Sequence, residues 1–370
     1  MTKFTEILLY EKELKAIKKS NLYRQRKIFD DELIDLASND YLGLSSNETL
    51  FKNAYEEVLK HKYHSPKASI LVNGYSPIHK DFEDNLKEAN HFEDALVVGS
   101  GFLANISLIE ALVRKGDTLF IDEEYHASGI LATKLLKKEQ VVVFSHNSYH
   151  DLENRIKTRD LKGRLIIAIE SIYSMNGNIA PKEIFDIASK YDALLIVDEA
   201  HSSGVLGDNL LGIYDYYNIK PNKNHIKMGT LGKAYGSYGA YILASKNIID
   251  FLINRAKAII YTTAPSLFDM ALANESLKYI LSNKVEIKEK IKQRQQIVKD
   301  NLNVETKSLI VAYEIGDNKK VLDIQSNLLE SGYIVGAIRQ PTVKSAIIRL
   351  ISKIDVSVID LQNVCNIIKK

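Results

Sequence analysis

Short apolar runs alternate with amphipathic segments through most of this chain. The runs rich in β-branched residues predict strands at 95–98, 118–121, 140–144, 164–170, 194–198, 226–230 and 240–244. Helical patterns separate many of them, including 101–113, 184–190 and 247–258. This alternation predicts an α/β fold, with a mostly parallel sheet that helices cover on both faces.

The segments on either side of this region predict smaller parts. Residues 1–20 carry charges throughout, which predicts an amphipathic helix rather than a signal peptide or a membrane span. A short strand is expected at 33–37, and a long helical stretch at 266–301 leads into a smaller α+β region. We therefore expect an N-terminal helix and arm at 1–45, an α/β domain at 46–265 and a C-terminal α+β domain at 266–370.

Composition limits the kinds of partner and compartment. The 370 residues carry a formal net charge of only +2, and no long block of like charge indicates nucleic-acid or membrane binding. The single cysteine, Cys365, excludes an intrachain disulfide and favours a reducing compartment. We expect a cytoplasmic protein.

Two segments carry the most informative chemistry. ALLIVDEAH at 193–201 delivers Asp198 to the end of a predicted strand, and MGTLGKAYGSYG at 228–239 places Lys233 among glycines. Pyridoxal phosphate (PLP) requires this combination, because the lysine forms a Schiff base and the carboxylate keeps the pyridine nitrogen protonated. His201, three residues after Asp198, could reach the phenolic oxygen of the ring, although backbone groups satisfy many such histidines.

Other interpretations of these segments are weaker. VDEAH also resembles the acidic box of an ATP-dependent helicase, which needs a G-x-x-x-x-G-K-[ST] loop upstream. The one Gly-Lys dipeptide is Gly232-Lys233, which follows the box and precedes Ala234. An isolated Lys233 would be read as a solvated surface lysine, but the surrounding pattern argues against that.

Further candidates lie near other predicted strand ends. GSGFLAN at 99–105 opens a predicted helix, which favours an anion such as phosphate, and Thr230 is a second phosphate candidate. His126 could stack on a cofactor ring or move protons. Arg349 interrupts an apolar run, so it is either part of a buried ion pair or a carboxylate clamp.

Metal binding is not expected. Asp122, Glu123 and His126 imitate a metal cluster, as do His146 and His150 at helical spacing. Neither group has a full ligand set.

The motifs, taken together and in order, resemble those of the α-oxoamine synthases, PLP enzymes of the aspartate-aminotransferase fold. The resemblance covers nearly the whole chain. It is carried by SNDYLGLS (38–45), GSGFLAN (99–105), DEEYHAS (122–128), ESIYSMNGNIAP (170–181), VDEAHSSGVLG (197–207), GTLGKAYGSYGA (229–240), YTTAP (261–265) and AIRQPTV (337–343), with Arg349 beyond. The region 46–265 would then be the PLP-binding domain. Asn176 and Asn178 stand where aspartates are common in this family.

The resemblance implies a role for each matching residue. Lys233 would bind the PLP aldehyde, Asp198 would pair with the pyridine nitrogen, and His126 would stack on the ring. The remaining implied contacts are His201 and Ser174 to the ring oxygen, Gly101, Phe102 and Thr230 to the phosphate, Thr262 and Thr263 to the phosphate of a neighbouring subunit, Arg349 to the amino-acid carboxylate, and Arg24 or Arg26 to the far carboxylate of the acyl substrate. The site would be shared across a homodimer.

The implied reaction joins an amino acid to an acyl thioester with loss of CO2. The resemblance is strongest to the biotin-pathway branch, in which L-alanine and a pimeloyl thioester give 8-amino-7-oxononanoate. Sister reactions remain open, including glycine with acetyl-CoA, glycine with succinyl-CoA (5-aminolevulinate synthesis) and serine with palmitoyl-CoA. A non-catalytic subunit of the same fold would typically lack the lysine, and Lys233 is present.

Overall fold

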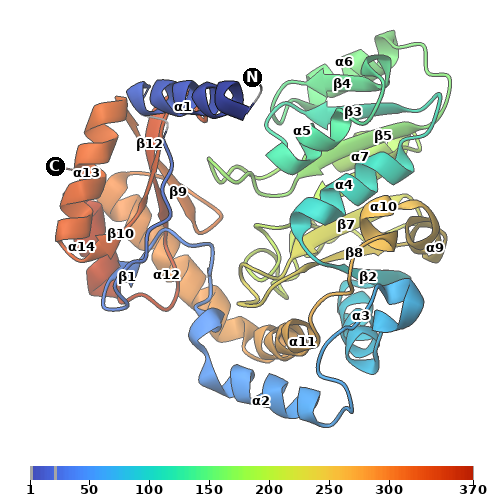
Figure 1. The fold of residues 1–370 in the computed structure, drawn as a ribbon, viewed down its shortest axis with the longest axis horizontal. Coiled ribbons are helices and arrows are strands. Elements are labelled where there is room, and N and C mark those ends of the chain that lie inside the picture. The colour runs from blue at the N-terminus through green and yellow to red at the C-terminus, as the bar shows by residue number, and fades with distance from the viewer. Residues whose placement is uncertain (1–2, 21–22, 370) are drawn as a thin grey trace. The chain divides into compact units, whose positions relative to one another are not determined.

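A computed structural model describes residues 3–20 and 23–369 (Figure 1). The chain forms two compact units, Met1–Ile34 and Asp35–Lys370. The first unit contains α1 (Lys3–Lys19), in agreement with the predicted helix. The side chains described in its second half are exposed, including Tyr10, Leu14 and Ile17. Within the described ranges, no helix is both long and apolar enough to cross a bilayer.

A seven-stranded sheet forms the centre of the second unit. β8 runs antiparallel to both its neighbours, and the remaining pairs are parallel. The strands lie in the order β2 (Asp94–Val98), β8 (Ala240–Ala244), β7 (His225–Thr230), β6 (Leu194–Asp198), β5 (Leu165–Glu170), β3 (Thr118–Asp122) and β4 (Val141–Phe144).

Both faces of this sheet are buried, which explains why its strands are almost continuously apolar. Ile166 and Ile196 point into one hydrophobic cluster, whereas Ile167 and Val197 point into the other, because successive side chains alternate between faces. The first cluster packs against α4 (Gly101–Leu112), α5 (Ala127–Thr133), α9 (Lys246–Arg255) and α10 (Lys257–Ile260), and the second against α2 (Glu48–Leu59), α3 (Pro77–Asn90), α6 (Tyr149–Thr158), α7 (Glu183–Lys190) and α11 (Leu267–Ser282).

The C-terminal part of the second unit has its own antiparallel sheet. Its central strand, β12 (Ala346–Ile351), carries Arg349, which pairs with Ala312 on one side and Gly336 on the other. The elements are α12 (Lys284–Leu302), β9 (Ile310–Gly316), α13 (Asn318–Glu330), β10 (Tyr333–Ile334), β11 (Gly336–Ile338), β12 (Ala346–Ile351) and α14 (Val358–Lys369). The short elements elsewhere are β1 (Ile34–Asp35), α8 (Ile213–Tyr216) and single turns at Leu44–Ser46, Ile70–Gly74 and Lys138–Gln140.

The predicted α/β class, with a mostly parallel sheet covered on both faces, is confirmed. The differences are local. The helix predicted at 247–258 breaks at Ala256, whose backbone is extended, and the stretch at 266–301 breaks at Asn283. The strand expected at 33–37 is only two residues long. The domain boundary at 265/266 stays a prediction.

Candidate active site

The carboxyl ends of three adjacent strands bring the main candidates to one edge of the sheet. Glu170 ends β5 and lies directly opposite Asp198, which ends β6. The next strand, β7, ends at Thr230, and the turn that follows carries Lys233. This edge is where α/β sheets bind their ligands, so the sheet topology itself assembles the candidate site.

Lys233 lies in a partly buried position against a histidine. Its Nζ is 2.7 Å from Nε2 of His201. Burial lowers the pKa of Lys233 to about 8, although the negative charges of Asp198 and Glu170 oppose the shift. An amine that loses its proton near neutral pH is suited to attack an aldehyde carbon.

His201 is buried and connects Lys233 to a tyrosine from far away in the sequence. Its second ring nitrogen, Nδ1, is 2.5 Å from the hydroxyl of Tyr41. Burial, together with the positive charges of Lys233 and Arg349, holds the pKa of His201 well below its usual value. The ring is therefore neutral, and two fixed contacts orient it.

Asp198 is oriented by a buried amide. Asn105 Nδ2, on α4, donates to Asp198 Oδ2 at 2.9 Å and to Ser128 Oγ at 3.0 Å, and its Oδ1 accepts from the hydroxyl of Tyr125 at 2.7 Å. Ser128 Oγ is also 2.7 Å from Nδ1 of His126. A continuous chain of hydrogen bonds therefore joins Asp198 to His126, a residue that is only partly buried.

The predicted phosphate residues meet at the N-terminus of α4. A Cβ added to Gly101, the first residue of this helix, would lie 3.7 Å from Cβ of Thr230. The free N–H groups of a helix of this length attract an anion. Thr230 Oγ1 donates to the carbonyl of Gly239 at 3.0 Å, so its hydroxyl would have to turn to meet a phosphate. The ring of Phe102 is 46% exposed beside this terminus.

Arg349 contacts neutral acceptors. Its Nε donates to the Ser174 carbonyl at 2.8 Å, and its Nη2 donates to Asn39 Oδ1 at 2.9 Å. Its side chain is buried, and burial lowers the pKa of the guanidinium. These two bonds occupy two of its five N–H donors. Neither of these two partners is a carboxylate, and the role of Arg349 as a carboxylate clamp stays a prediction.

Some predicted residues are not brought to this edge by any contact described. Thr262 and Thr263 lie between α10 and α11, and their implied role needs a second copy of the chain. Arg24 and Arg26 are exposed in the first unit. Ser174 contributes its backbone carbonyl to Arg349, and its implied side-chain contact stays a prediction.

Sequence reasoning assigned no role to three residues that the fold places here: Tyr41, Asn105 and Glu170. Asn105 follows Gly101 by one helical turn, and that spacing could have been used to place it beside the strand ends. Glu170 is buried, and burial together with the charge of Asp198 raises its pKa well above the usual range. Among the described residues, its Oε1 has no hydrogen-bond partner.

The residues at this edge fit PLP. They supply an amine with a lowered pKa, an oriented carboxylate and a helix N-terminus with space for an anion. Through the described residues, no group of three or more His, Cys, Asp or Glu side chains is arranged to hold a metal ion.

Comparison with known proteins identifies the family. Residues 31–368 match the family described as aminotransferase class I and II. An 8-amino-7-oxononanoate synthase from Helicobacter pylori strain J99 is 44% identical over 359 residues, covering 97% of this chain and 96% of that protein. The structure of an 8-amino-7-oxononanoate synthase from Francisella tularensis has a TM-score of 0.76 at 27% identity, covering 92% of this chain and 97% of that one. A serine palmitoyltransferase from S. paucimobilis with bound PLP–myriocin aldimine shares the fold, with a TM-score of 0.88 at 22% identity and coverage of 99% and 97%.

The chain belongs to the class I and II aminotransferase family and, within it, to the α-oxoamine synthases. It is a PLP-dependent transferase similar to the 8-amino-7-oxononanoate synthases. The predicted PLP-dependent transferase fold and the predicted cofactor are both confirmed.

Proposed function

We propose that the protein condenses L-alanine with a pimeloyl thioester, carried by CoA or a carrier protein, and forms 8-amino-7-oxononanoate, CO2 and the free thiol. The observation that carries this proposal is the 44% identity, over 97% of the chain, to the Helicobacter pylori synthase. The chemistry of the candidate site supports the same reaction class. It combines a lysine of low pKa, an oriented carboxylate and a buried arginine at one sheet edge.

Substrate and cofactor are held by separate groups. Asp198 would hold the proton on the pyridine nitrogen, and Arg349 would bind the carboxylate of alanine with its remaining N–H donors. His126 would stack on the ring face. The further contacts are His201 and Ser174 to the ring oxygen, Gly101, Phe102 and Thr230 to the phosphate, Thr262 and Thr263 to the phosphate in a neighbouring copy, and Arg24 or Arg26 to the distal carboxylate of the pimeloyl group.

Proton transfer depends on two of these side chains. When bound, PLP supplies an electron sink for the carbanion that forms at Cα of the amino acid. Lys233 removes the Cα proton, and its pKa of about 8 lets the free amine act as a base near neutral pH. His126 donates a proton toward the thioester oxygen. Its pKa is lowered by burial, and its Nδ1 contact with Ser128 fixes the ring.

The active site is proposed to be completed by a second copy of the chain. Helix α2 buries Leu50, Ala54 and Val58 against its own unit. A second apolar stripe on the same helix, Phe51, Tyr55 and Leu59, is more than half exposed. An exposed apolar stripe of this kind fits an interface between copies. Sedimentation should give a mass of twice 41.8 kDa, and a single-copy mass would overturn the dimer.

The protein is proposed to act in the cytoplasm. Its one cysteine, Cys365, is a free and buried thiol, which is compatible with a reducing compartment.

Product identification tests the reaction. Purified protein is incubated with PLP and pimeloyl-CoA, together with L-alanine or, in a parallel reaction, glycine. Mass spectrometry should detect 8-amino-7-oxononanoate with alanine alone. A PLP-bound protein that forms no product with either amino acid would overturn the substrate assignment and leave the family intact. Arg349→Lys should raise the KM for alanine at least tenfold, because lysine cannot form a two-bond clamp.

A further inference from the structure

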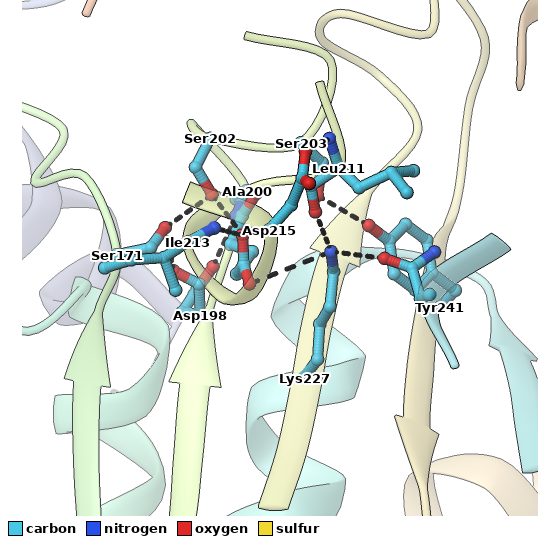
Figure 2. A network of polar contacts seen from close by, with 12 residues as sticks. Ser171, Asp198, Ala200, Ser202, Ser203, Leu211, Ile213, Asp215, Lys227 and Tyr241 are labelled. Atoms are coloured by element: carbon cyan, nitrogen blue, oxygen red, sulfur yellow. Dashed lines mark hydrogen bonds and ion pairs between the residues drawn. The ribbon is translucent and has the colours of Figure 1, made fainter. Parts of the chain in front are cut away.

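A buried ion pair joins β7 to the residue that immediately follows Asp198. Figure 2 shows Lys227 on β7. Its ammonium group lies 3.7 Å from Glu199 Oε1, and neither side chain is more than 1% exposed. The ammonium also donates to Asn90 Oδ1 at 2.7 Å and to the carbonyl of Leu211. No role proposed above uses either residue of this pair.

Glu199 connects the pair to the turn that carries Asp198 and His201. Its Oε2 accepts from Ser202 Oγ at 2.6 Å and from the amide of Ile213 at 2.7 Å. Ser202 Oγ is 2.7 Å from Ser171 Oγ, and Ser171 donates to the Asp198 carbonyl through its amide at 2.8 Å and its hydroxyl at 3.0 Å. An unbroken path of polar contacts therefore runs from the ion pair to the backbone of Asp198 (Figure 2).

The two charges depend on each other. Burial lowers the pKa of Lys227 and raises the pKa of Glu199, while the charge of each partner opposes the shift in the other. The carboxylate also has no room to move toward Gly212, where an added Cβ would lie 1.7 Å from Glu199 Oε2. Loss of one charge therefore leaves the other buried and unpaired in a closed space.

We propose that Lys227 and Glu199 are positioning residues that hold the turn from Asp198 to Gly204, and through it keep Asp198 and His201 in place around the cofactor. This inference rests on the proposed cofactor roles of Asp198, His201 and Lys233. Lys227 compensates the charge of Glu199, the residue that immediately follows Asp198. Neither side chain of the pair touches substrate or cofactor.

The test compares Lys227→Met with the pair-removing double variant Lys227→Met/Glu199→Gln. In full-length protein freed of PLP, amide hydrogen exchange in residues 199–204 should rise at least tenfold in the single variant and remain unchanged in β12. The dissociation constant for PLP, followed by visible absorbance, should also rise at least tenfold. The double variant should restore both quantities to within about threefold, because it leaves no unpaired charge.

A second, more exposed ion pair at the opposite edge of the same sheet provides a control. Arg164 and Asp117 lie 2.7 Å apart at the amino ends of β5 and β3, far from the strand ends of the site. Arg164→Met should leave the PLP dissociation constant and exchange in residues 199–204 within twofold of wild type. If Lys227→Met does not accumulate as folded protein, Glu199→Gln alone serves for the same comparison.

The outcomes separate this inference from the proposed function. The positioning role would be overturned if Lys227→Met left amide exchange in residues 199–204 unchanged. It would also be overturned if the wild type binds PLP and Lys227→Met binds it with the same affinity. An equal loss of PLP affinity in Arg164→Met would overturn it as well. If wild type itself fails to bind PLP, the proposed function fails, and the exchange data still decide whether the pair holds the turn.

Discussion

The site lysine should reduce the stability of the cofactor-free protein, so Lys233→Met should stabilise it. The pKa of Lys233 is about 8 in the folded chain and 10.5 in its ordinary state. At about 1.36 kcal/mol per pKa unit, this difference of about 2.5 units corresponds to a penalty of about 3 kcal/mol below pH 8. Loss of the contact with His201 removes about 1 kcal/mol of stability. The net gain expected at pH 7 is therefore about 2 kcal/mol.

The sign of the pH dependence follows from proton binding. Between pH 8 and 10.5 the folded protein has released the Lys233 proton, whereas the unfolded chain still holds it. The stability of the wild type therefore rises with pH in this window, while that of the variant lacks this contribution. At pH 7 the free energy of unfolding of Lys233→Met should exceed that of wild type by about 2 kcal/mol. This difference should shrink as pH rises, and above pH 10.5 the variant should be less stable than wild type by about 1 kcal/mol.

Urea unfolding of PLP-free protein at pH 7, 8, 9 and 10 measures this difference. Lys220→Met provides the control, because Lys220 is exposed and its replacement should change stability by less than about 0.5 kcal/mol at every pH. A Lys233→Met protein no more stable than wild type at pH 7, or a difference that does not vary with pH, would refute the reasoning.

Two other substitutions and one measurement of thiol reactivity test further contacts and buried groups. Asn105→Leu removes the hydrogen bond to Asp198, so it should lower the free energy of unfolding by about 2–3 kcal/mol. It should also weaken PLP binding at least tenfold, and unchanged PLP binding in a titration would contradict this. Burial raises the pKa of Glu83 to about 7 from 4.5, so the folded state loses stability as pH rises through that range. In urea unfolding, Glu83→Gln should therefore be more stable than wild type by up to about 3 kcal/mol at pH 8 and equally stable at pH 4.5. Burial raises the pKa of Cys365 to about 12. At pH 8 a disulfide reagent should therefore react with one thiol in urea and with none in the native protein. A rapid reaction of the native protein would contradict the burial of Cys365.

Local sequence patterns were enough to predict the strand ends and the lysine turn. The apolar run before Asp198 stops abruptly at charged residues, and the glycines around Lys233 leave its amine accessible. These signals lie within a few residues of one another, so no knowledge of tertiary structure is needed to find them. The α/β alternation is predictable for the same reason.

The contacts between distant segments could not be predicted in this way. Tyr41 and His201 are 160 residues apart, and Arg349 and Asn39 are 310 residues apart. Strand order and the docking of the C-terminal sheet decide which of these residues meet, and neither is encoded in a local pattern. The raised pKa of Glu170 likewise depends on its burial opposite Asp198. The strand pattern places both residues at strand ends, but it does not give the extent of their burial.

The central claim is that Lys233 is the residue that binds PLP. Purified protein is incubated with PLP, reduced with borohydride to fix the imine, digested and mapped by mass spectrometry. We expect a phosphopyridoxyl group on Lys233 and its loss in Lys233→Ala. A label on the buried Lys227 instead, or a wild-type protein that acquires no label, would show that Lys233 is not the residue that binds PLP.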